Sequence, residues 1–293
     1  MVRAMQVGLH VASFRWAGGA PAIRETLGRV GEAADAAGCQ HVSVMDHYFQ
    51  IDSMFAAHDP MLEAYTTLGF LAARTERVKL HVLATGVTYR HPGLLAKIVA
   101  TLDALSGGRA ELAIGAAWYE REHRGLGVPF PPLGERFERL EETIRVCVQM
   151  WSDDDGPFDG RHYRLAETLC SPRPARRPRL IVCGGGERKT LRLAARYADE
   201  SNVIARSSDE VARKRDVLRR HCEQIGRDPR EVAMSLLYVG DALVNGATER
   251  FVEEMRPYAA LGVDTVVVMP LVEEPVGFVE RLGDAVVPAL AEL

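Results

Sequence analysis

Residues 44–50, which read VMDHYFQ, bring several chemically capable side chains together at one point of the chain. Asp46 and His47 are neighbours, and a histidine can gain or lose a proton near neutral pH as a general acid or base. Tyr48 and Phe49 could line a ligand pocket or simply pack. The apolar residues before them predict a buried strand, so this is either a reactive corner or a strand emerging into a loop. Since Asp46 stands beside it at a strand end, we favour a reactive His47.

Three consecutive glycines, Gly184, Gly185 and Gly186, stand at the predicted entry to a helix in CGGGERKT. Glycine leaves the backbone N–H groups bare, and such groups at a helix N-terminus bind anions, most often phosphate. Arg188 and Lys189 follow closely and add positive charge. A tight strand-to-helix turn would also use glycine. Three in a row exceed what a turn needs, so we predict a phosphate site.

The segment GRAELAIGAAWYE ends in small residues, Gly115, Ala116 and Ala117. Small side chains would let a planar ligand approach the backbone, although tight packing of a strand against a helix would need them equally. His123, a few residues further on, is a second candidate for acid, base or hydrogen-bond chemistry. His10 could point into the same region, but periodicity leaves the direction of its side chain open.

These side chains are expected at the ends of strands, because the sequence alternates short β-rich runs with segments of helical periodicity. The runs are nearly continuously apolar, as is typical of strands buried on both faces. The expected strands are 5–11, 41–46, 78–85, 109–115, 179–185, 201–205, 231–240 and 264–270. The expected helices are 20–38, 60–75, 92–106, 134–151, 187–199, 208–225, 247–262 and 276–293.

Eight strand–helix units in 293 residues predict an α/β fold of the (β/α)8 TIM-barrel type, forming a single domain over residues 1–293. The rival is an open, doubly wound sheet, which usually has a glycine-rich turn after its first strand. The residues there, HVASFRWAGG, match that turn poorly. Residues 152–178 interrupt the rhythm with turn signals at Asp155-Gly156 and Asp159-Gly160, which predicts an insertion containing a small hairpin. In a barrel, reactive groups gather at the C-terminal strand ends.

The composition limits the kinds of partner. The net charge is -4 and the basic residues are scattered, which argues against nucleic acid as a main partner. No apolar run approaches the roughly 18 residues of a membrane span, and the N-terminus lacks the apolar core of a signal peptide. Five widely spaced cysteines form no CxxC pair, and no zinc-like spacing is present. These patterns predict no metal site and favour a reducing cytoplasm.

Three segments together resemble the luciferase-like flavin and deazaflavin oxidoreductases, most closely the branch that uses coenzyme F420. They are VMDHYFQ, the long stretch of residues 64–151, and RLIVCGGGERKTLRLAARYAD. Each motif alone is weakly specific, whereas their order and spacing together are strongly specific. The likeness covers most of residues 5–205 and fades toward the C-terminus.

The resemblance implies a TIM barrel whose mouth holds the isoalloxazine-type ring, with Asp46 and His47 beside it and the cofactor phosphate at the three glycines. The residues it implies for cofactor binding are Asp46, Val82, Leu83, Ala84, Thr85, Gly115, Ala116, Ala117, Tyr119, His123, Gly184, Gly185, Gly186, Glu187 and Arg188. Family members often carry a non-proline cis peptide in the third strand, for which Val82–Leu83 is the candidate here. Two departures are Ala117, where the family commonly has glycine, and ADESNV, where a turn commonly reads Asp-Gly-Trp-Asn.

The resemblance further implies hydride transfer between F420 and an unidentified small organic substrate. His47 would give or take the accompanying proton, and Asp46 would orient it or bond the ring. Residues 118–133 and 152–178 would shield the site from water. One alternative is an FMNH2-dependent monooxygenase in the same barrel mouth, and another is a sensor that holds a flavin without turnover. A homodimer is also implied; the face of Tyr65, Leu68 and Ala72 could serve for it or could equally cover the barrel.

Overall fold

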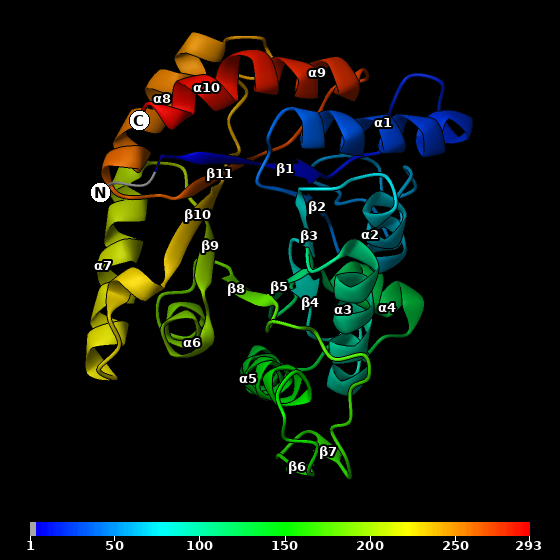
Figure 1. The fold of residues 1–293 in the computed structure, drawn as a ribbon, viewed down its shortest axis with the longest axis vertical. Coiled ribbons are helices and arrows are strands. Elements are labelled where there is room, and N and C mark those ends of the chain that lie inside the picture. Colours follow the sequence, from blue (N-terminus) through cyan, green and yellow to red (C-terminus); the bar gives the residue numbers. More distant parts are fainter. Residues whose placement is uncertain (1–3) are drawn as a thin grey trace.

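The computed structural model describes residues 4–293, and its centre is a barrel of parallel strands surrounded by helices (Figure 1). The barrel strands are β1 (Gln6–Val11), β2 (His41–Val44), β3 (Lys79–Val82), β4 (Thr85–Gly86), β5 (Glu111–Gly115), β8 (Arg179–Cys183), β9 (Glu200–Ile204), β10 (Ala233–Leu237) and β11 (Thr265–Val268). Their order is β3-β2-β1-β11-β10-β9-β8-β5-β4. Because β3 and β4 are pieces of one strand, the two ends of this order meet. The TIM-barrel prediction is therefore confirmed, and the open-sheet alternative is wrong.

Both faces of the strands are buried, because successive side chains point alternately toward the helices and the barrel interior. In β11, Val266 and Val268 belong to the main core under the helices, while Val267 lies inside the barrel. Its neighbours there are Leu83, Ala113 and Ile181. The continuous apolar runs of the sequence thus form two cores, one on each face of the sheet.

Part of the barrel interior is polar and holds three buried histidines. His10 and His81 hydrogen-bond through Nδ1 to neighbouring strands, at 2.9 and 3.0 Å. The partners are Ser43 Oγ and Glu111 Oε2, respectively. The His41 ring packs against that of His81, with ring centres 4.4 Å apart. Gly8 of β1 makes room for His41, because a Cβ at Gly8 would lie 2.2 Å from its ring.

Helices cover the outside of the barrel. They are α1 (Ile23–Ala36), α2 (Ala64–Ala72), α3 (Pro92–Ser106), α4 (Glu120–Leu126), α5 (Leu133–Met150), α6 (Thr190–Tyr197), α7 (Ser208–Gln224), α8 (Thr248–Ala260), α9 (Pro275–Arg281) and α10 (Val287–Ala291). Short 3-10 turns occupy Ala20–Ala22 and Pro229–Glu231, and a π-helical turn, Leu282–Val286, joins α9 to α10. Helices α1 and α9 lie side by side, so the last unit packs against the first (Figure 1).

The helix boundaries follow their capping residues. Helix α3 begins with Pro92 at its first turn and ends at Gly107, whose φ of 68° is left-handed, as predicted. The expected start of the second helix at Pro60 is wrong. Helix α2 begins after Glu63, whose carboxylate accepts a hydrogen bond from Thr66 N at 2.7 Å and so caps the helix.

Residues 152–178 form the predicted insertion. Within them, β6 (Phe158–Asp159) and β7 (Arg164–Leu165) pair antiparallel, which confirms the hairpin. Glu142 of α5 accepts hydrogen bonds at 2.8 to 3.0 Å from the backbone N–H groups of residues 161–163. The hairpin therefore packs on α5 and lies beyond that helix (Figure 1). The shielding of the site by residues 152–178 stays a prediction.

The face of α2 considered for a dimer turns inward. Leu68 and Ala72 are buried in the main core, and Tyr65 packs against it. That face therefore covers the barrel, and a homodimer stays a prediction without an assigned surface. Within residues 4–293, no helix has both the length and the apolar character that crossing a bilayer requires.

Candidate active site

The C-terminal ends of β2, the third strand and β5 lie together and carry many of the predicted site residues. His47 follows β2, Gly86 ends β4, and Glu122 lies on α4 just after β5. Side chains from all three segments are joined by hydrogen bonds. The barrel closure thus assembles a polar cluster from residues that are far apart in the sequence.

His47 is held by a buried carboxylate. Its Nδ1 lies 2.6 Å from Glu122 Oε1. The Glu122 side chain is fully buried, whereas the His47 side chain keeps 13% of its surface exposed. Within residues 4–293, His47 Nε2 has no hydrogen-bond partner, and it is not a buried atom. One ring nitrogen is therefore fixed and the other is accessible.

Glu122 accepts hydrogen bonds on both oxygens. The backbone N–H groups of Tyr48 and Phe49 donate to Oε2 at 2.7 and 3.3 Å, and the Tyr89 hydroxyl donates to Oε1. Burial raises the pKa of the Glu122 carboxyl, but the hydrogen bonds from His47 and Tyr89 outweigh this effect. The pKa of Glu122 is therefore below its ordinary value, and the group is a carboxylate at neutral pH.

Asp46 has a different partner from the one expected. Arg90 Nη1 and Nη2 lie 2.8 and 2.9 Å from its two oxygens, and Gly86 N donates to Oδ2 at 2.8 Å. Burial lowers the pKa of Arg90, but Asp46 raises it by more, so the guanidinium keeps its charge. From the sequence, we expected Asp46 to orient His47 or to bond the ring. The carboxylate that hydrogen-bonds His47 is instead Glu122.

The third strand is interrupted between β3 and β4 by a cis peptide bond that joins Leu83 to Ala84. The candidate bond, Val82–Leu83, is therefore wrong, and the cis bond is the next one along. Val82 belongs to the core under the helices, whereas Leu83 lies inside the barrel. Thr85 is buried, and its hydroxyl lies 2.8 Å from that of Tyr65 on α2.

The small residues after β5 lie close to neighbouring strands. A Cβ on Gly115 would lie 3.4 Å from Cys183 O and 3.8 Å from Ala84 Cβ. Ala117 has a φ of 56°, a left-handed conformation that favours glycine. Arg136 of α5 donates to the carbonyls of Ala116 and Ala117 and so fixes this turn.

Tyr119 and His123 flank the site in different ways. The Tyr119 ring packs edge-on against His47, with ring centres 5.6 Å apart, and its hydroxyl donates to Asp52 Oδ2 at 2.7 Å. His123 is fully buried; its Nδ1 lies 2.8 Å from Tyr119 O and its Nε2 lies 2.7 Å from Thr88 Oγ1. Tyr119 therefore contacts the His47 ring, whereas both nitrogens of His123 have partners within the protein.

The three glycines form an open turn before α6. Gly184 has a φ of 119°, a value that L side chains rarely adopt. Within residues 4–293, the N–H groups of Gly185, Gly186 and Glu187 have no acceptor. Lys214 Nζ lies 2.9 Å from Gly185 O and holds the turn from behind. The turn thus presents several bare donors, as an anion site requires.

The charged residues after this turn differ in their availability. The Glu187 carboxylate pairs with Arg213 of α7 at 2.8 Å, so its side chain is engaged away from the turn. Arg188 is exposed, and no carboxylate within residues 4–293 lies within ion-pair distance of it. Lys189 is also exposed and has no ion-pair partner within residues 4–293, so both Arg188 and Lys189 can add positive charge for a ligand.

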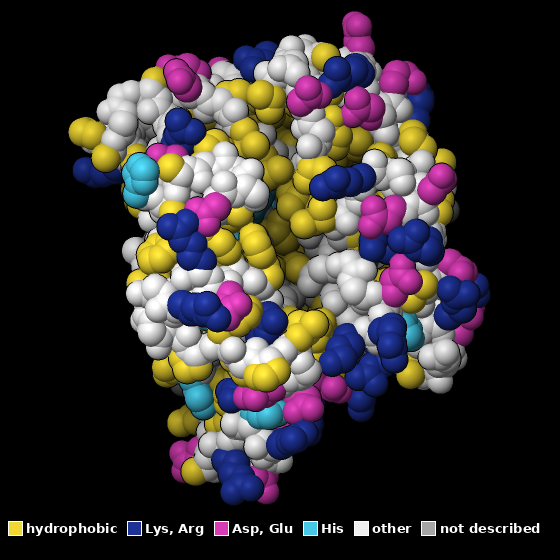
Figure 2. Space-filling model, turned by 180° about the vertical axis from the view of Figure 1, so that it is seen from behind, with side chains coloured by type: hydrophobic (Ala, Val, Ile, Leu, Met, Phe, Trp, Pro, Cys, Tyr) yellow, Lys and Arg dark blue, Asp and Glu magenta, His cyan; other side chains and the backbone are white. Residues whose placement is uncertain are grey.

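Another part of the barrel rim is apolar. Ala12, Met45 and Ile51 form a buried cluster beyond the ends of β1 and β2. The partly exposed residues packed on it are Met54, Met61, Met269 and Leu271. One face of the molecule is hollowed at its centre, and hydrophobic side chains line the hollow (Figure 2). Because methionine adapts to irregular shapes, the rim cluster suits an apolar ligand of variable form.

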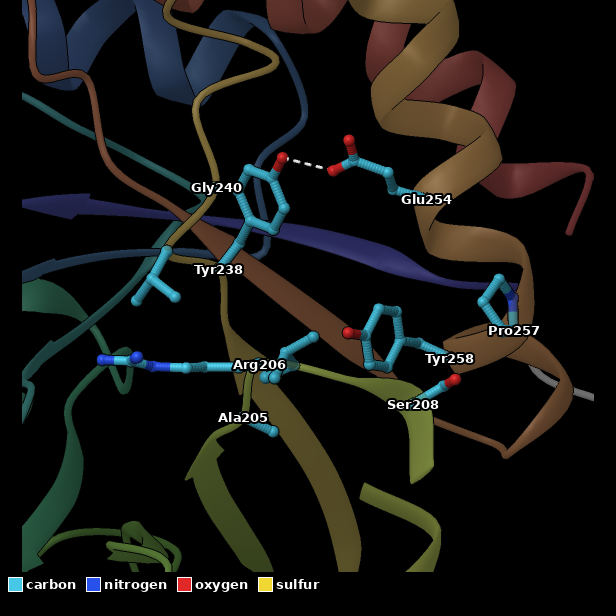
Figure 3. A pocket seen from close by; sticks show the side chains of 10 residues that line it. Ala205, Arg206, Ser208, Tyr238, Gly240, Glu254, Pro257 and Tyr258 are labelled. Carbon is cyan, nitrogen blue, oxygen red and sulfur yellow. Dashed lines mark hydrogen bonds between the residues drawn. The ribbon is translucent and has the colours of Figure 1, made fainter. Parts of the chain in front are cut away.

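A separate cavity of about 550 Å³ lies between the β9–β10 side of the barrel and α8. Arg206, Tyr238 and Tyr258 are among its lining residues (Figure 3). The Tyr238 hydroxyl donates to Glu254, which also lines the cavity (Figure 3). Its lining shares no residue with the His47 cluster, so we treat it as distinct. Within the described part of the chain, no group of three or more potential metal ligands comes together.

Three residues join the site without a role assigned from the sequence: Tyr89, Arg90 and Glu122. Each follows the third or fourth barrel strand, so the sequence could have predicted its place at the rim of the barrel. The missing information was which side chains meet. Glu122 and His47 are 75 residues apart, and no local pattern links them.

Comparisons with known proteins agree with this architecture. The family model described as luciferase-like monooxygenase matches residues 5–265. The F420-dependent glucose-6-phosphate dehydrogenase of Kineococcus radiotolerans is 36% identical over 154 residues, covering 52% of this chain and 44% of that protein. The FMNH2-dependent dimethylsulfone monooxygenase of Pseudomonas putida is 33% identical over 142 residues, covering 48% of this chain and 39% of that protein. The matched stretches thus span less than half the length of these relatives.

Solved structures share the fold over nearly the whole chain. An F420-dependent secondary alcohol dehydrogenase in complex with an F420-acetone adduct has a TM-score of 0.80 and 18% identity, covering 98% of this chain and 99% of that chain. A long-chain alkane monooxygenase has a TM-score of 0.81 and 14% identity, covering 100% of this chain and 92% of that chain. Since the family model also matches most of its length, the chain belongs to the luciferase-like monooxygenase family.

Proposed function

We propose that this chain is an F420-dependent oxidoreductase that transfers a hydride between the deazaflavin and a small organic substrate. The observation that carries the proposal is the His47–Glu122 pair, which leaves an accessible imidazole nitrogen at the barrel rim. The 36% identity to an F420-dependent dehydrogenase favours F420 as the cofactor. In this proposal, His47 exchanges the proton that accompanies the hydride.

The residues present fit a cofactor of this kind. The bare N–H groups of Gly185 and Gly186 suit a phosphate, and Arg188 adds a cation nearby. In this proposal a planar ring lies beside the small residues Gly115 and Ala116, at the end of β5 next to the third strand. When bound, the deazaflavin would supply the hydride donor or acceptor.

The side chains around the proposed ring have separate tasks. His47 exchanges its proton at Nε2, because Nδ1 is held by Glu122. A general acid or base placed in this way contributes about 10²- to 10⁴-fold to a rate. Asp46 secures the rim through Arg90 and Gly86 instead of carrying the proton. The methionine-rich cluster is the proposed wall for an apolar part of the substrate.

Titration with F420 and, separately, with FMN tests the proposal. We expect F420 to bind, and Gly185→Asp to weaken its binding by about tenfold or more, because a Cβ at Gly185 would lie 2.8 Å from Lys214 Nζ and the turn that carries the bare donors would have to shift. Gly134→Asp is the matched control, since Gly134 is an exposed glycine with open space around it. Tight binding of FMN together with no affinity for F420 would contradict the proposal.

The second candidate is an FMNH2-dependent monooxygenase. The 33% identity to the dimethylsulfone monooxygenase favours it, and both activities would use the same barrel mouth. A deazaflavin reacts poorly with oxygen, so substrate-dependent oxygen consumption with reduced FMN separates the two. A protein that binds either cofactor but turns over with neither would be a sensor.

A further inference from the structure

The environment of Glu122 is unusual for an acidic side chain. It is fully buried, and all four donors that reach it come from the barrel rim. Two are the backbone N–H groups of Tyr48 and Phe49, which directly follow His47. A single carboxylate therefore holds the His47 ring and the main chain after it.

We infer that Glu122 is a positioning residue that keeps the proton of neutral His47 on Nδ1 and presents Nε2 to the reacting proton. The inference rests on the proposed function, because it assumes that His47 exchanges a proton with substrate. Glu122 itself stays ionised and exchanges no proton in the reaction. It acts through His47 and has no contact with substrate or cofactor in this account.

The hydrogen-bond chemistry permits only one arrangement at Oε1. An ionised carboxylate has acceptors and no donor, so the nitrogen 2.6 Å from it must carry a proton. The Tyr89 hydroxyl approaches the same oxygen and also donates, since burial and the neighbouring carboxylate raise the pKa of Tyr89. With its proton on Nδ1, the neutral ring has its lone pair on Nε2, the nitrogen that is accessible.

The position of α4 makes this contact possible. Helix α4 begins at Glu120, directly after the loop that leaves β5, and places Glu122 toward the ring while Glu120 faces solvent. Glu120 pairs with Arg124 of the same helix at 2.8 Å. The two glutamates thus stand two residues apart on one short helix, one on His47 and the other on the surface. This makes Glu120 the matched control for Glu122.

Nitrogen-15 NMR of the histidine side chains tests the inference without any cofactor. We expect neutral wild-type His47 to show a protonated Nδ1 and an unprotonated Nε2, with its signal assigned by its loss in His47→Asn. Glu122→Gln should move the ring toward the Nε2–H form or toward a mixture, because the amide can turn its NH2 group to Nδ1. Glu120→Gln should leave the signals as in the wild type. An unchanged tautomer in Glu122→Gln, or a mixture already present in the wild type, would overturn the inference.

Glutamine is close to glutamate in shape, yet the variant could fail to fold. In that case the wild-type protein alone tests the inference. A proton held between Nδ1 and a buried carboxylate should give a far-downfield proton NMR signal that exchanges slowly with water. Absence of that signal in the wild type would overturn the inference.

Kinetics then separates this inference from the proposed function. We expect Glu122→Gln to lower kcat by about 10- to 100-fold, part of the loss expected from removing the acid or base altogether. Its affinity for F420 should equal that of the wild type. If F420 does not bind at all, the proposed function fails while the NMR result stands. If F420 turnover is normal in Glu122→Gln, the positioning role fails while the proposed function stands.

Discussion

Histidines occur in two regions of the barrel, at the rim and in the interior, and their surroundings differ sharply. At the rim, His47 has a carboxylate on one nitrogen and an accessible second nitrogen. In the interior, His10, His41 and His81 are buried. Burial lowers the pKa of His10 and His41 to about 3 and that of His81 to about 4. The interior histidines are therefore neutral at physiological pH.

The contrast teaches that position, not residue type, assigns the task. An interior histidine fills space, as His41 does above Gly8, or hydrogen-bonds a neighbouring strand, as His10 and His81 do. The rim histidine combines access with a charged partner, which is what proton exchange requires. Changes at His47 should therefore alter activity at constant stability, and changes at the interior histidines should alter stability.

The largest expected effect is the loss of proton exchange at the rim. We expect His47→Asn to lower kcat by about 10²- to 10⁴-fold, the contribution of a general acid or base, while the melting temperature stays within error. Steady-state kinetics and thermal unfolding measure the two quantities. His58→Asn is the control, since His58 is an exposed histidine in the loop after β2. Turnover of His47→Asn at the wild-type rate would remove His47 from the mechanism.

The interior histidines should make the fold sensitive to acid. The pKa of each of these histidines is 6.5 in the unfolded chain and lower in the folded protein. Below pH 6.5 the unfolded state therefore binds more protons, and the free energy of unfolding falls as the pH falls toward 3–4; above pH 6.5 this loss is absent. At pH 5 each such histidine costs about 2 kcal/mol. Glu111 and Glu200, whose pKa values burial raises, take up protons in the folded state and offset part of this loss.

Urea unfolding at pH 7.5, 6 and 5 measures the slope. We expect the free energy of unfolding to fall by at least about 2 kcal/mol over this range, and His58→Asn to show the same slope as the wild type. A flat profile would mean that the interior histidines do not stay neutral on folding.

Packing in the interior gives a smaller effect. Gly8→Ala would place a Cβ 2.2 Å from the buried His41 ring, so the ring must move. We expect a loss of about 1–3 kcal/mol in the free energy of unfolding. Gly69→Ala on α2, where a Cβ has nothing within 4 Å, should cause no loss. Equal stability of both variants would contradict the tight packing of His41.

The smallest effect concerns the backbone beside the rim. Ala117 has a φ of 56°, and a left-handed conformation costs an L-residue about 1–2 kcal/mol. Ala117→Gly should relieve this and gain up to about 1 kcal/mol, after the loss from greater unfolded-state freedom. Ala116→Gly, at a residue without positive φ, should lower stability instead. Thermal unfolding distinguishes the two, and a loss in both would show that Ala117 is unstrained.

The fold was predictable because strands buried on both faces have a strong signal. The eight apolar runs and their helices were recognised, as was the hairpin in residues 152–178. Helix α4 was missed, because its seven residues, EREHRGL, have no apolar periodicity. The start of α2 was misplaced because Pro60 suggested a first turn, whereas Glu63 caps the helix.

The site was predictable in its location and less so in its pairings. The strand-end rule located His47 and the three glycines at the rim. It could not show that Asp46 pairs with Arg90, or that Glu122, after β5, reaches His47, after β2, past the third strand. Such contacts depend on the register and closure of the sheet. For the same reason, the sequence could not show that the side chains of His10, His41 and His81 point into the barrel interior.

Nitrogen-15 NMR of all the histidine side chains during titration with F420 tests the central claim most directly, because one spectrum reports on both regions. We expect the His47 signals to shift in proportion to bound F420 while those of His10, His41 and His81 stay unchanged. His47 signals that remain fixed at saturating F420, or interior signals that move instead, would contradict a place for His47 beside the cofactor.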